Sequence, residues 1–199
     1  MSEIISFNTE EIAKNPGAIT QSIPTFELVG ETNPILKEVL SEFDFSNPPV
    51  NPNEFASSLV ETCRLHKGYG LSANQCGFKH RVFVMGAEDS FVSFFNPKII
   101  WQSNDEVNMM EGCLSFPLLG LRVNRPSTIE VEYQDFNGQK QTTMLNGLSA
   151  RVFQHELDHL NGIVYTKKVK PLALQSGMKK RNKLIKTLKL IYWQHQLNL

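Results

Sequence analysis

The residues best suited to chemistry lie close together in segment 154–162, which reads QHELDHLNG. From His155 to His159 the segment follows an H-E-x-x-H pattern. Residues four apart share one face of a helix, so both imidazoles can bind the same metal ion. Glu156 then lies beside that ion, where its carboxylate can take a proton from metal-bound water. The pattern predicts a hydrolytic metal centre on a helix.

The third metal ligand is less obvious, because catalytic sites of this kind usually have three protein ligands and one open position. One class of H-E-x-x-H protease supplies a later histidine, but Tyr165 occupies that position here. No Asp or Glu follows Asp158, and His195 is the only later histidine. Upstream, Cys113 in EGCLSFP offers a thiolate, which binds soft and borderline metals well. We therefore expect Cys113 as the third ligand; the alternative is an ordinary buried cysteine.

Length and composition favour one compact domain. The chain has 199 residues, of which 41% are hydrophobic, enough for a substantial core. No apolar run is long enough to cross a membrane, and the acidic start MSEIISFNTEEIAKN resembles neither a secretory signal nor a transit peptide. The chain has three cysteines, an odd number that indicates free thiols in a reducing compartment. We expect a cytoplasmic protein that binds neither membrane nor DNA.

Charge is distributed unevenly along the chain. After His159 there are nine Lys or Arg and no Asp or Glu, so residues 1–159 carry 11 basic and 20 acidic side chains. The basic end contains KKVK at 167–170 and KKRNKLIKTLK at 179–189. Such a stretch is either a solvated helix face or a surface that meets polyanions such as RNA, and charge alone favours the solvated face.

Local patterns predict two helices before the basic end. The first covers 51–68, with Asn51 as its cap, Pro52 in its first turn and Gly68 at its end. Its Cys63 repeats with apolar residues at four-residue spacing, which indicates core packing. The second, 149–161, holds the histidine pair, with Ser149 as a possible cap and Gly162 as its C-terminal stop.

A glycine-rich loop at 68–77 and several strands lie between these helices. The predicted strands are 81–85, 91–95, 98–102, 128–134 and 140–145, the last two joined through Asn137-Gly138. From 174 onward a last helix places Leu184, Leu188 and Ile191 on one face. The fold class expected is α+β: a single domain of mixed, mostly antiparallel short β-sheets around a central metal-binding helix, with a C-terminal helix.

Three segments together resemble the peptide deformylase family, whose members remove formyl groups from the N-termini of new proteins. GYGLSANQ (68–75) is similar to the family's G-x-G-L-A-A-x-Q, EGCLS (111–115) matches its second motif, and QHELDHLNG resembles its Q-H-E-x-D-H-L-x-G. The resemblance covers residues 26–175. It implies three parts: an N-terminal extension (1–25), a catalytic domain (26–175) and a basic C-terminal helix (176–199).

The resemblance implies a role for each site residue. Cys113, His155 and His159 would bind one divalent metal ion per chain, most often Fe²⁺, with Zn²⁺, Ni²⁺ or Co²⁺ as substitutes. Metal-bound water would attack the formyl carbon, with Glu156 as general base. The Gln75 side chain and the Leu114 backbone N–H would stabilise the oxyanion, each such donor contributing roughly 3–4 kcal/mol.

The implied substrate is an N-formylmethionyl peptide or nascent chain, bound in extended form along the glycine loop. Substrate contacts are expected from Tyr69, Gly70, Gly112 and Val152. Glu111 is expected to pair with Arg125 and hold the EGC strand. Some bacterial members dock a C-terminal helix on the ribosome, which makes the basic helix here a candidate ribosome contact.

The chain departs from the family pattern at a few positions. Ser72 replaces an alanine, Gly120 stands where many bacterial members have a peptide-binding arginine, and Arg151 lies where they are often more apolar, which is expected to reshape the pocket mouth. Two other functions remain open. A metalloprotease is disfavoured by the missing downstream ligand, and a non-catalytic scaffold by the intact site residues.

Overall fold

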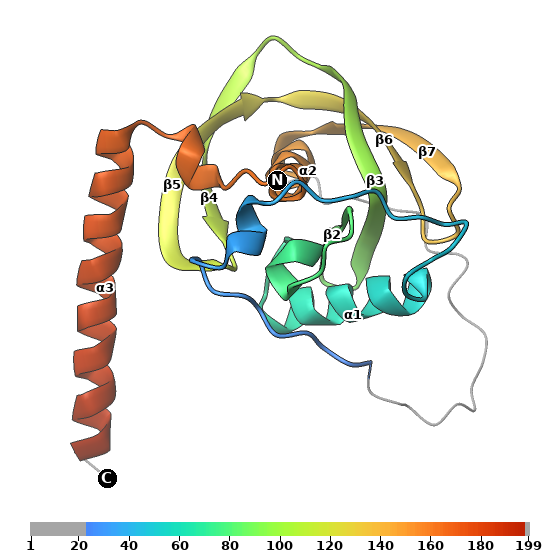
Figure 1. The fold of residues 1–199 in the computed structure, drawn as a ribbon. Coiled ribbons are helices and arrows are strands. Elements are labelled where there is room, and N and C mark those ends of the chain that lie inside the picture. Colours follow the sequence, from blue (N-terminus) through green and yellow to red (C-terminus); the bar gives the residue numbers. More distant parts are fainter. Residues whose placement is uncertain (1–22, 198–199) are drawn as a thin grey trace.

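The structure, a computed structural model, describes residues 23–197, with side chains as far as Tyr192. The predicted N-terminal extension therefore lies outside the described residues, apart from 23–25, and so does the side chain of His195. The described residues form an α+β fold with two antiparallel sheets, as predicted (Figure 1). No helix among them is both long and apolar enough to cross a membrane.

Three α-helices and three short 3-10 turns are found in this part of the chain. They are η1 (Pro34–Lys37), α1 (Pro52–Leu65), η2 (Ala73–Cys76), α2 (Gly147–Leu160), η3 (Tyr165–Lys168) and α3 (Pro171–Leu197). The strands are β1 (Gly70–Ser72), β2 (Val82–Ala87), β3 (Ser90–Gln102), β4 (Glu106–Cys113), β5 (Phe116–Pro126), β6 (Thr128–Gln134) and β7 (Lys140–Asn146).

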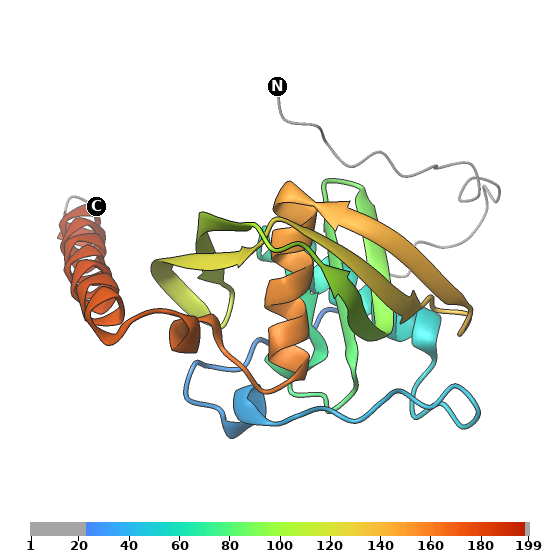
Figure 2. The ribbon, with the colours of Figure 1, turned by 90° about the horizontal axis from the view of Figure 1, so that it is seen from above.

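The strands form one five-stranded sheet and one hairpin. The larger sheet has the order β1-β2-β3-β6-β7, and β4 pairs with β5. Figure 2 shows α2 crossing the middle of the molecule, between the β4–β5 hairpin and the larger sheet. α2 therefore packs against both sheets, and residues from either can reach its side chains.

Helix α1 begins as predicted and ends earlier. The Asn51 side chain accepts hydrogen bonds from the backbone N–H groups of Asn53 and Glu54, so it is the cap. The helix ends at Leu65, and Lys67, not Gly68, adopts a positive φ of 55°. Gly68 is required for another reason: a Cβ there would lie 2.9 Å from Leu114 Cδ1. Cys63 is fully buried in the core, as predicted.

The two strands predicted at 91–95 and 98–102 are one strand, β3. The register against β6 shifts between Phe95 and Lys98, where Asn96 has a φ of 51°. The Asn96 side chain hydrogen-bonds both the N–H and the C=O of Phe43, at 2.7 and 2.9 Å. This bulge accommodates Pro97 without ending the strand. The predicted hairpin of β6 and β7 is confirmed, with Gly138 at a φ of 78°.

Helix α2 starts two residues before its predicted beginning. Its N-cap is Asn146, so Ser149 lies inside the helix and is not the cap. Gly162 follows the helix at a φ of 68°, as the predicted stop requires. A Cβ on Gly162 would lie 2.5 Å from the Lys37 carbonyl oxygen, so glycine is also required here by the close approach of η1.

Helix α3 begins at Pro171, three residues earlier than predicted, and extends away from the body (Figure 1). Its first turns pack Leu174 and Met178 beside buried residues of β5. A Cβ on Gly177 would lie 2.6 Å from Leu121 Cδ2, so glycine allows the close approach. The side chains of Leu184, Leu188 and Ile191, which the sequence places on one face of this helix, are 43–45% exposed.

Candidate metal centre

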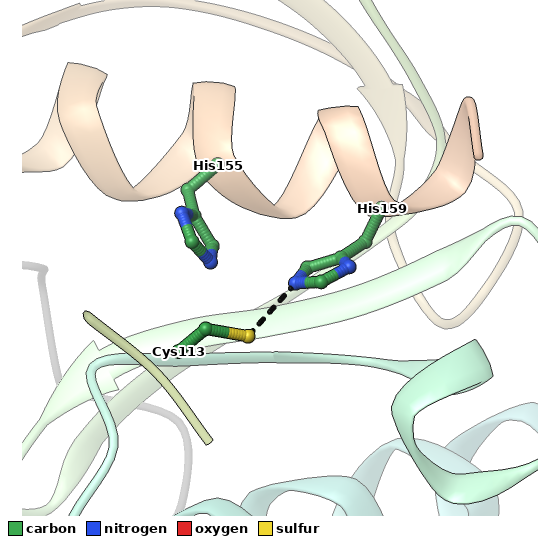
Figure 3. A group of neighbouring side chains, drawn as sticks. All are labelled: Cys113, His155 and His159. Atoms are coloured by element: carbon green, nitrogen blue, oxygen red, sulfur yellow. Dashed lines mark hydrogen bonds between the residues drawn. The ribbon is translucent and has the colours of Figure 1, made fainter. Parts of the chain in front are cut away.

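Three side chains from two elements converge on one point. His155 and His159 lie one turn apart on α2, and Cys113 ends β4 (Figure 3). One ligand atom from each lies within 4.8 Å of the others, and Cys113 Sγ is 3.2 Å from His159 Nε2. A thiolate with two imidazoles is a donor set that suits Fe²⁺, Zn²⁺, Co²⁺ and Ni²⁺. The residues present therefore fit a divalent transition metal.

Glu111 fixes the orientation of His155. Its Oε2 lies 3.0 Å from His155 Nδ1, which favours the tautomer whose Nε2 is free to bind a metal. The predicted pair of Glu111 with Arg125 is confirmed, through two hydrogen bonds of 2.7 and 2.9 Å. Asp158 lies behind this pair and accepts from Arg125 Nη1 at 2.6 Å.

Charge and burial set the protonation states of the site, and they favour metal binding at His159 but oppose it at His155. Burial lowers the pKa of His155, but hydrogen bonds to Cys113 and Glu111 raise it to about 10, so a metal must displace a proton there when it binds. Burial opposes ionisation of Glu111, but hydrogen bonds from Arg125, His155 and Arg151 outweigh it and hold its pKa well below the usual range. Burial, with the charges of His155 and Arg125, lowers the pKa of His159. Glu111 is therefore an ionised acceptor and His159 a neutral imidazole, the form that binds metals.

Glu156 lies beside the two histidines in a site closed to water on most sides. Its side chain is 4% exposed, and burial raises its pKa to about 7. A Cβ on Gly70 would lie 2.6 Å from Glu156 Oε1, so glycine leaves the room that this carboxylate occupies. No residue of the described chain hydrogen-bonds Glu156 Oε2, so this buried oxygen is free to accept a proton.

Gln75 reaches the site from η2 with its amide held in one orientation. Its Oε1 accepts from the backbone N–H and the hydroxyl of Ser72, both at 3.0 Å. Its Nε2 therefore points the other way and donates to Cys113 Sγ and Ser115 Oγ, both at 3.3 Å. The substitution of alanine by Ser72 thus adds a hydrogen bond at the site.

A cavity of about 660 Å³ opens beside the three ligands. Tyr69, Gly70, Gly112 and Val152 line it, and so does Leu114. Sequence reasoning missed three exposed apolar side chains on its rim, which belong to Met110, Leu118 and Leu148.

The Met110 side chain is 59% exposed, although it is apolar. The alternation of side chains along a strand could have indicated this exposure. Neighbouring residues of a strand point to opposite faces, and the next residue, Glu111, points inward.

Arg151 lines the cavity, but its guanidinium is turned inward. Arg151 lies inside α2, it is only 5% exposed, and its guanidinium binds Glu111. The other cysteines take no part in the site. Burial raises the pKa of both Cys63 and Cys76, the latter to about 12, so both are ordinary protonated thiols.

A half-buried thiol, two imidazoles and an adjacent carboxyl beside an open cavity define a metal-dependent hydrolase site. Comparison with known proteins agrees. Residues 26–175 match the family model of polypeptide deformylase. A peptide deformylase of Finegoldia magna is 39% identical over 145 residues, which cover 72% of this chain and 88% of the relative.

Solved structures show the same likeness. A peptide deformylase of Synechococcus elongatus, in complex with actinonin, has a TM-score of 0.74 and 30% identity, covering 89% of this chain and 95% of that one. An Acinetobacter baumannii deformylase with Met-Ala-Ser bound has a TM-score of 0.69 and 27% identity, covering 73% of this chain and 98% of that one. The chain belongs to the polypeptide deformylase family, and its activity is peptide deformylation.

Proposed function

We propose that Cys113, His155 and His159 bind one Fe²⁺ ion per chain, which Zn²⁺, Ni²⁺ or Co²⁺ can replace. The observation that carries this proposal is the convergence of their three ligand atoms within 4.8 Å. When bound, the metal lowers the pKa of a water molecule and polarises the formyl oxygen of the substrate.

Glu156 is the general base of the proposed reaction. It takes a proton from the attacking water and then passes it to the leaving amine nitrogen, so that formate and a free N-terminus are released. Its burial and a pKa of about 7 support this role, because a carboxylate near neutrality can both accept and return a proton.

The negative charge that develops on the formyl oxygen needs donors that are already in place. Gln75 Nε2 is such a donor, since Ser72 fixes the amide and Nε2 points at Cys113 Sγ, 3.3 Å away. The Leu114 backbone N–H is the second, because Leu114 directly follows the ligand Cys113 at the cavity. The Gln75 donor is held in place before the reaction begins, which limits the reorganisation the reaction requires.

The substrate is a formylmethionyl peptide in extended form. Val152 and Tyr69 line the cavity and offer apolar surface to the methionine side chain, while Gly70 and Gly112 let the peptide backbone pass close to the site. Gly70 belongs to β1, an edge strand of the larger sheet, so a peptide can add to it as a further strand. The Met-Ala-Ser bound to the Acinetobacter baumannii relative is the peptide that removal of the formyl group from formyl-Met-Ala-Ser would leave.

Outside the catalytic site we propose a domain organisation and a role for the C-terminal helix. Residues 26–175 are the catalytic domain, 1–25 an extension, and 176–199 a basic helix that contacts ribosomal RNA in the cytoplasm. The described part of the helix supports that contact with exposed lysines on its surface, which are Lys179, Lys180, Lys183, Lys186 and Lys189. A chain ending at Asn182, which keeps the docked turns, should sediment with ribosomes less than the full chain; equal sedimentation would refute the contact.

Formate release from formyl-Met-Ala-Ser tests the proposed mechanism. We expect release by protein purified without oxygen and supplied with Fe²⁺ or Ni²⁺, and none after chelation. Glu156→Ala should abolish release while the protein still binds metal. Release that survives in Glu156→Ala would contradict the assigned base. Digestion of casein would instead favour an internal protease, and no release by folded, metal-loaded protein would favour a binding scaffold.

A further inference from the structure

Arg151 makes more contacts around the metal centre than the proposed reaction requires. It precedes His155 by four residues on α2, so both side chains lie on the same face of the helix. Arg151 Nη1 donates to Glu111 Oε1 at 2.8 Å and to the Val123 carbonyl at 2.9 Å, and Nη2 donates to the Val107 carbonyl. One buried guanidinium thus joins α2 to both strands of the β4–β5 hairpin.

Glu111 connects Arg151 to the metal centre. Its Oε1 accepts from Arg125 Nε and Arg151 Nη1, and its Oε2 accepts from Arg125 Nη2 and lies 3.0 Å from His155 Nδ1. A carboxylate has about four acceptor sites, so these four partners fill them. Arg151 and His155 contact opposite oxygens of the Glu111 carboxylate. A change in the contact between Arg151 and Oε1 therefore also moves Oε2 relative to His155.

Charge balance gives a second, independent reason for Arg151. Two carboxylates, Glu111 and Asp158, lie buried behind the metal centre, and Arg125 is shared between them at 2.7 and 2.6 Å. Lys168 reaches Asp158 at 3.1 Å from a more exposed position. Arg151 is the second buried cation, so the two buried carboxylates are matched by two buried arginines. Without it, one buried negative charge would be left poorly compensated.

We propose that Arg151 is a positioning residue of the metal centre, which fixes the imidazole of His155 through Glu111. The inference rests on the proposed metal site. A direct role in binding substrate is disfavoured although Arg151 lines the cavity, because Nη1 and Nη2 are already bonded to Glu111, Val123 and Val107. The arginine acts on the ligand and not on the peptide.

The test compares Arg151→Met, Arg151→Lys and a control, Arg122→Met. Arg122 is an exposed arginine of β5 whose Nη1 donates to the Asn108 carbonyl at 3.3 Å, so the control removes an arginine from the same hairpin. Each protein is loaded with Co²⁺, and the metal affinity is measured by competition with a chelator. Loss of a group that orients a metal ligand typically weakens binding about 10–100-fold. We expect that loss in Arg151→Met, a smaller loss in Arg151→Lys, and none in Arg122→Met.

The visible absorption spectrum of bound Co²⁺ adds a readout of geometry. We expect the bands of Arg151→Met to shift relative to wild type, because the His155 ring is less well fixed, and those of Arg122→Met to stay unchanged. An unchanged spectrum and affinity in Arg151→Met would overturn the inference. If Arg151→Met does not fold, the Co²⁺ affinity and spectrum of Arg151→Lys provide the test. Values equal to those of wild type would then overturn the inference.

A double-variant cycle with Glu111→Gln separates positioning from general support of the fold. If Arg151 acts through Glu111, the losses of Co²⁺ affinity in the two single variants should not add in the double variant. Additive losses would mean that Arg151 acts through the backbone carbonyls alone, which would contradict the inference. Wild-type protein that binds no Co²⁺ would refute the metal site itself, whereas wild-type binding equalled by Arg151→Met would refute only the role of Arg151.

Discussion

Helix α2 buries polar side chains, whereas the distal half of α3 exposes apolar ones. In α2 the polar side chains Arg151, Gln154 and Glu156 are buried, while in α3 the apolar Leu184 and Leu188 are 43 and 45% exposed. The burial of polar groups in α2 is stabilised by partners, since Arg151 binds Glu111, and Gln154 Nε2 donates to the Pro126 carbonyl at 3.0 Å. The distal half of α3 extends beyond the body, where no described residue covers its apolar face (Figure 1).

This difference shows that the position of a side chain in the fold, and not its polarity, decides whether it is held in one conformation. A side chain of α2 has neighbours on both sheets, so its rotamer and its chemistry are set by them. A side chain of distal α3 has neighbours mainly on its own helix. Substitutions should therefore have large effects around α2 and small ones on distal α3.

Phe153→Ala should cause the largest loss of stability. Phe153 is fully buried in α2 and its ring packs edge-on against Phe83 and Phe94, with centroids 5.1 and 5.3 Å away. Removing a buried phenylalanine ring costs about 3–5 kcal/mol of unfolding free energy. Urea denaturation of wild type and variant measures it. A loss below about 1 kcal/mol would show that the α2 core is looser than its burial suggests.

Gln75→Met should affect catalysis more than folding. The variant keeps the length of the side chain and removes the donor Nε2, which points at Cys113 Sγ from 3.3 Å. Loss of one oxyanion donor typically lowers kcat about 10²–10³-fold. Steady-state kinetics on formyl-Met-Ala-Ser, with bound metal measured in parallel, checks it. A normal kcat in a fully metallated variant would exclude Gln75 from the oxyanion site.

Ser72→Ala should have a smaller effect on the same step. It removes the hydroxyl that donates to Gln75 Oε1 at 3.0 Å, while the Ser72 backbone N–H still holds that oxygen. A single buried hydrogen bond is worth roughly 0.5–1.5 kcal/mol. We expect kcat to fall by a few-fold and KM to stay constant. A rise in KM with unchanged kcat would place the serine in substrate binding instead.

Leu188→Ala should change almost nothing within the protein. The side chain is exposed on distal α3, and such surface substitutions usually alter stability by less than about 0.5 kcal/mol. Both the urea midpoint and kcat should equal those of wild type. A loss of stability comparable to that of Phe153→Ala would mean that this face of α3 is covered in solution, which would break the comparison of the two helices.

Local patterns in the sequence predicted the features that depend on near neighbours. The H-E-x-x-H spacing placed His155 and His159 on one helix face, and the Asn137-Gly138 turn joined β6 to β7. Cys113 was reached by eliminating downstream ligands, and the structure brings it to the histidines. The histidine pair and the turn depend on spacings of only a few residues, whereas Cys113 could be reached only through its residue type and the lack of other ligands.

Features set by distant contacts could not be predicted in this way. Arg151 lies next to apolar residues in the sequence, and its inward position depends on Glu111, 40 residues earlier. Gly68 has no positive φ, and its lack of a side chain instead leaves room for Leu114, whose Cδ1 would lie 2.9 Å from a Cβ there. In each case a partner from another element decides the outcome.

The most direct test of the central claim is a metal titration of the chelated protein under anaerobic conditions. Formate release from formyl-Met-Ala-Ser is measured as Fe²⁺ or Ni²⁺ is added in steps. Activity should rise linearly and level off at one metal ion per chain, and Cys113→Ser should bind the metal more weakly, because it removes the thiolate. Full activity in metal-free protein, or a titration unchanged by Cys113→Ser, would contradict a centre built from Cys113, His155 and His159.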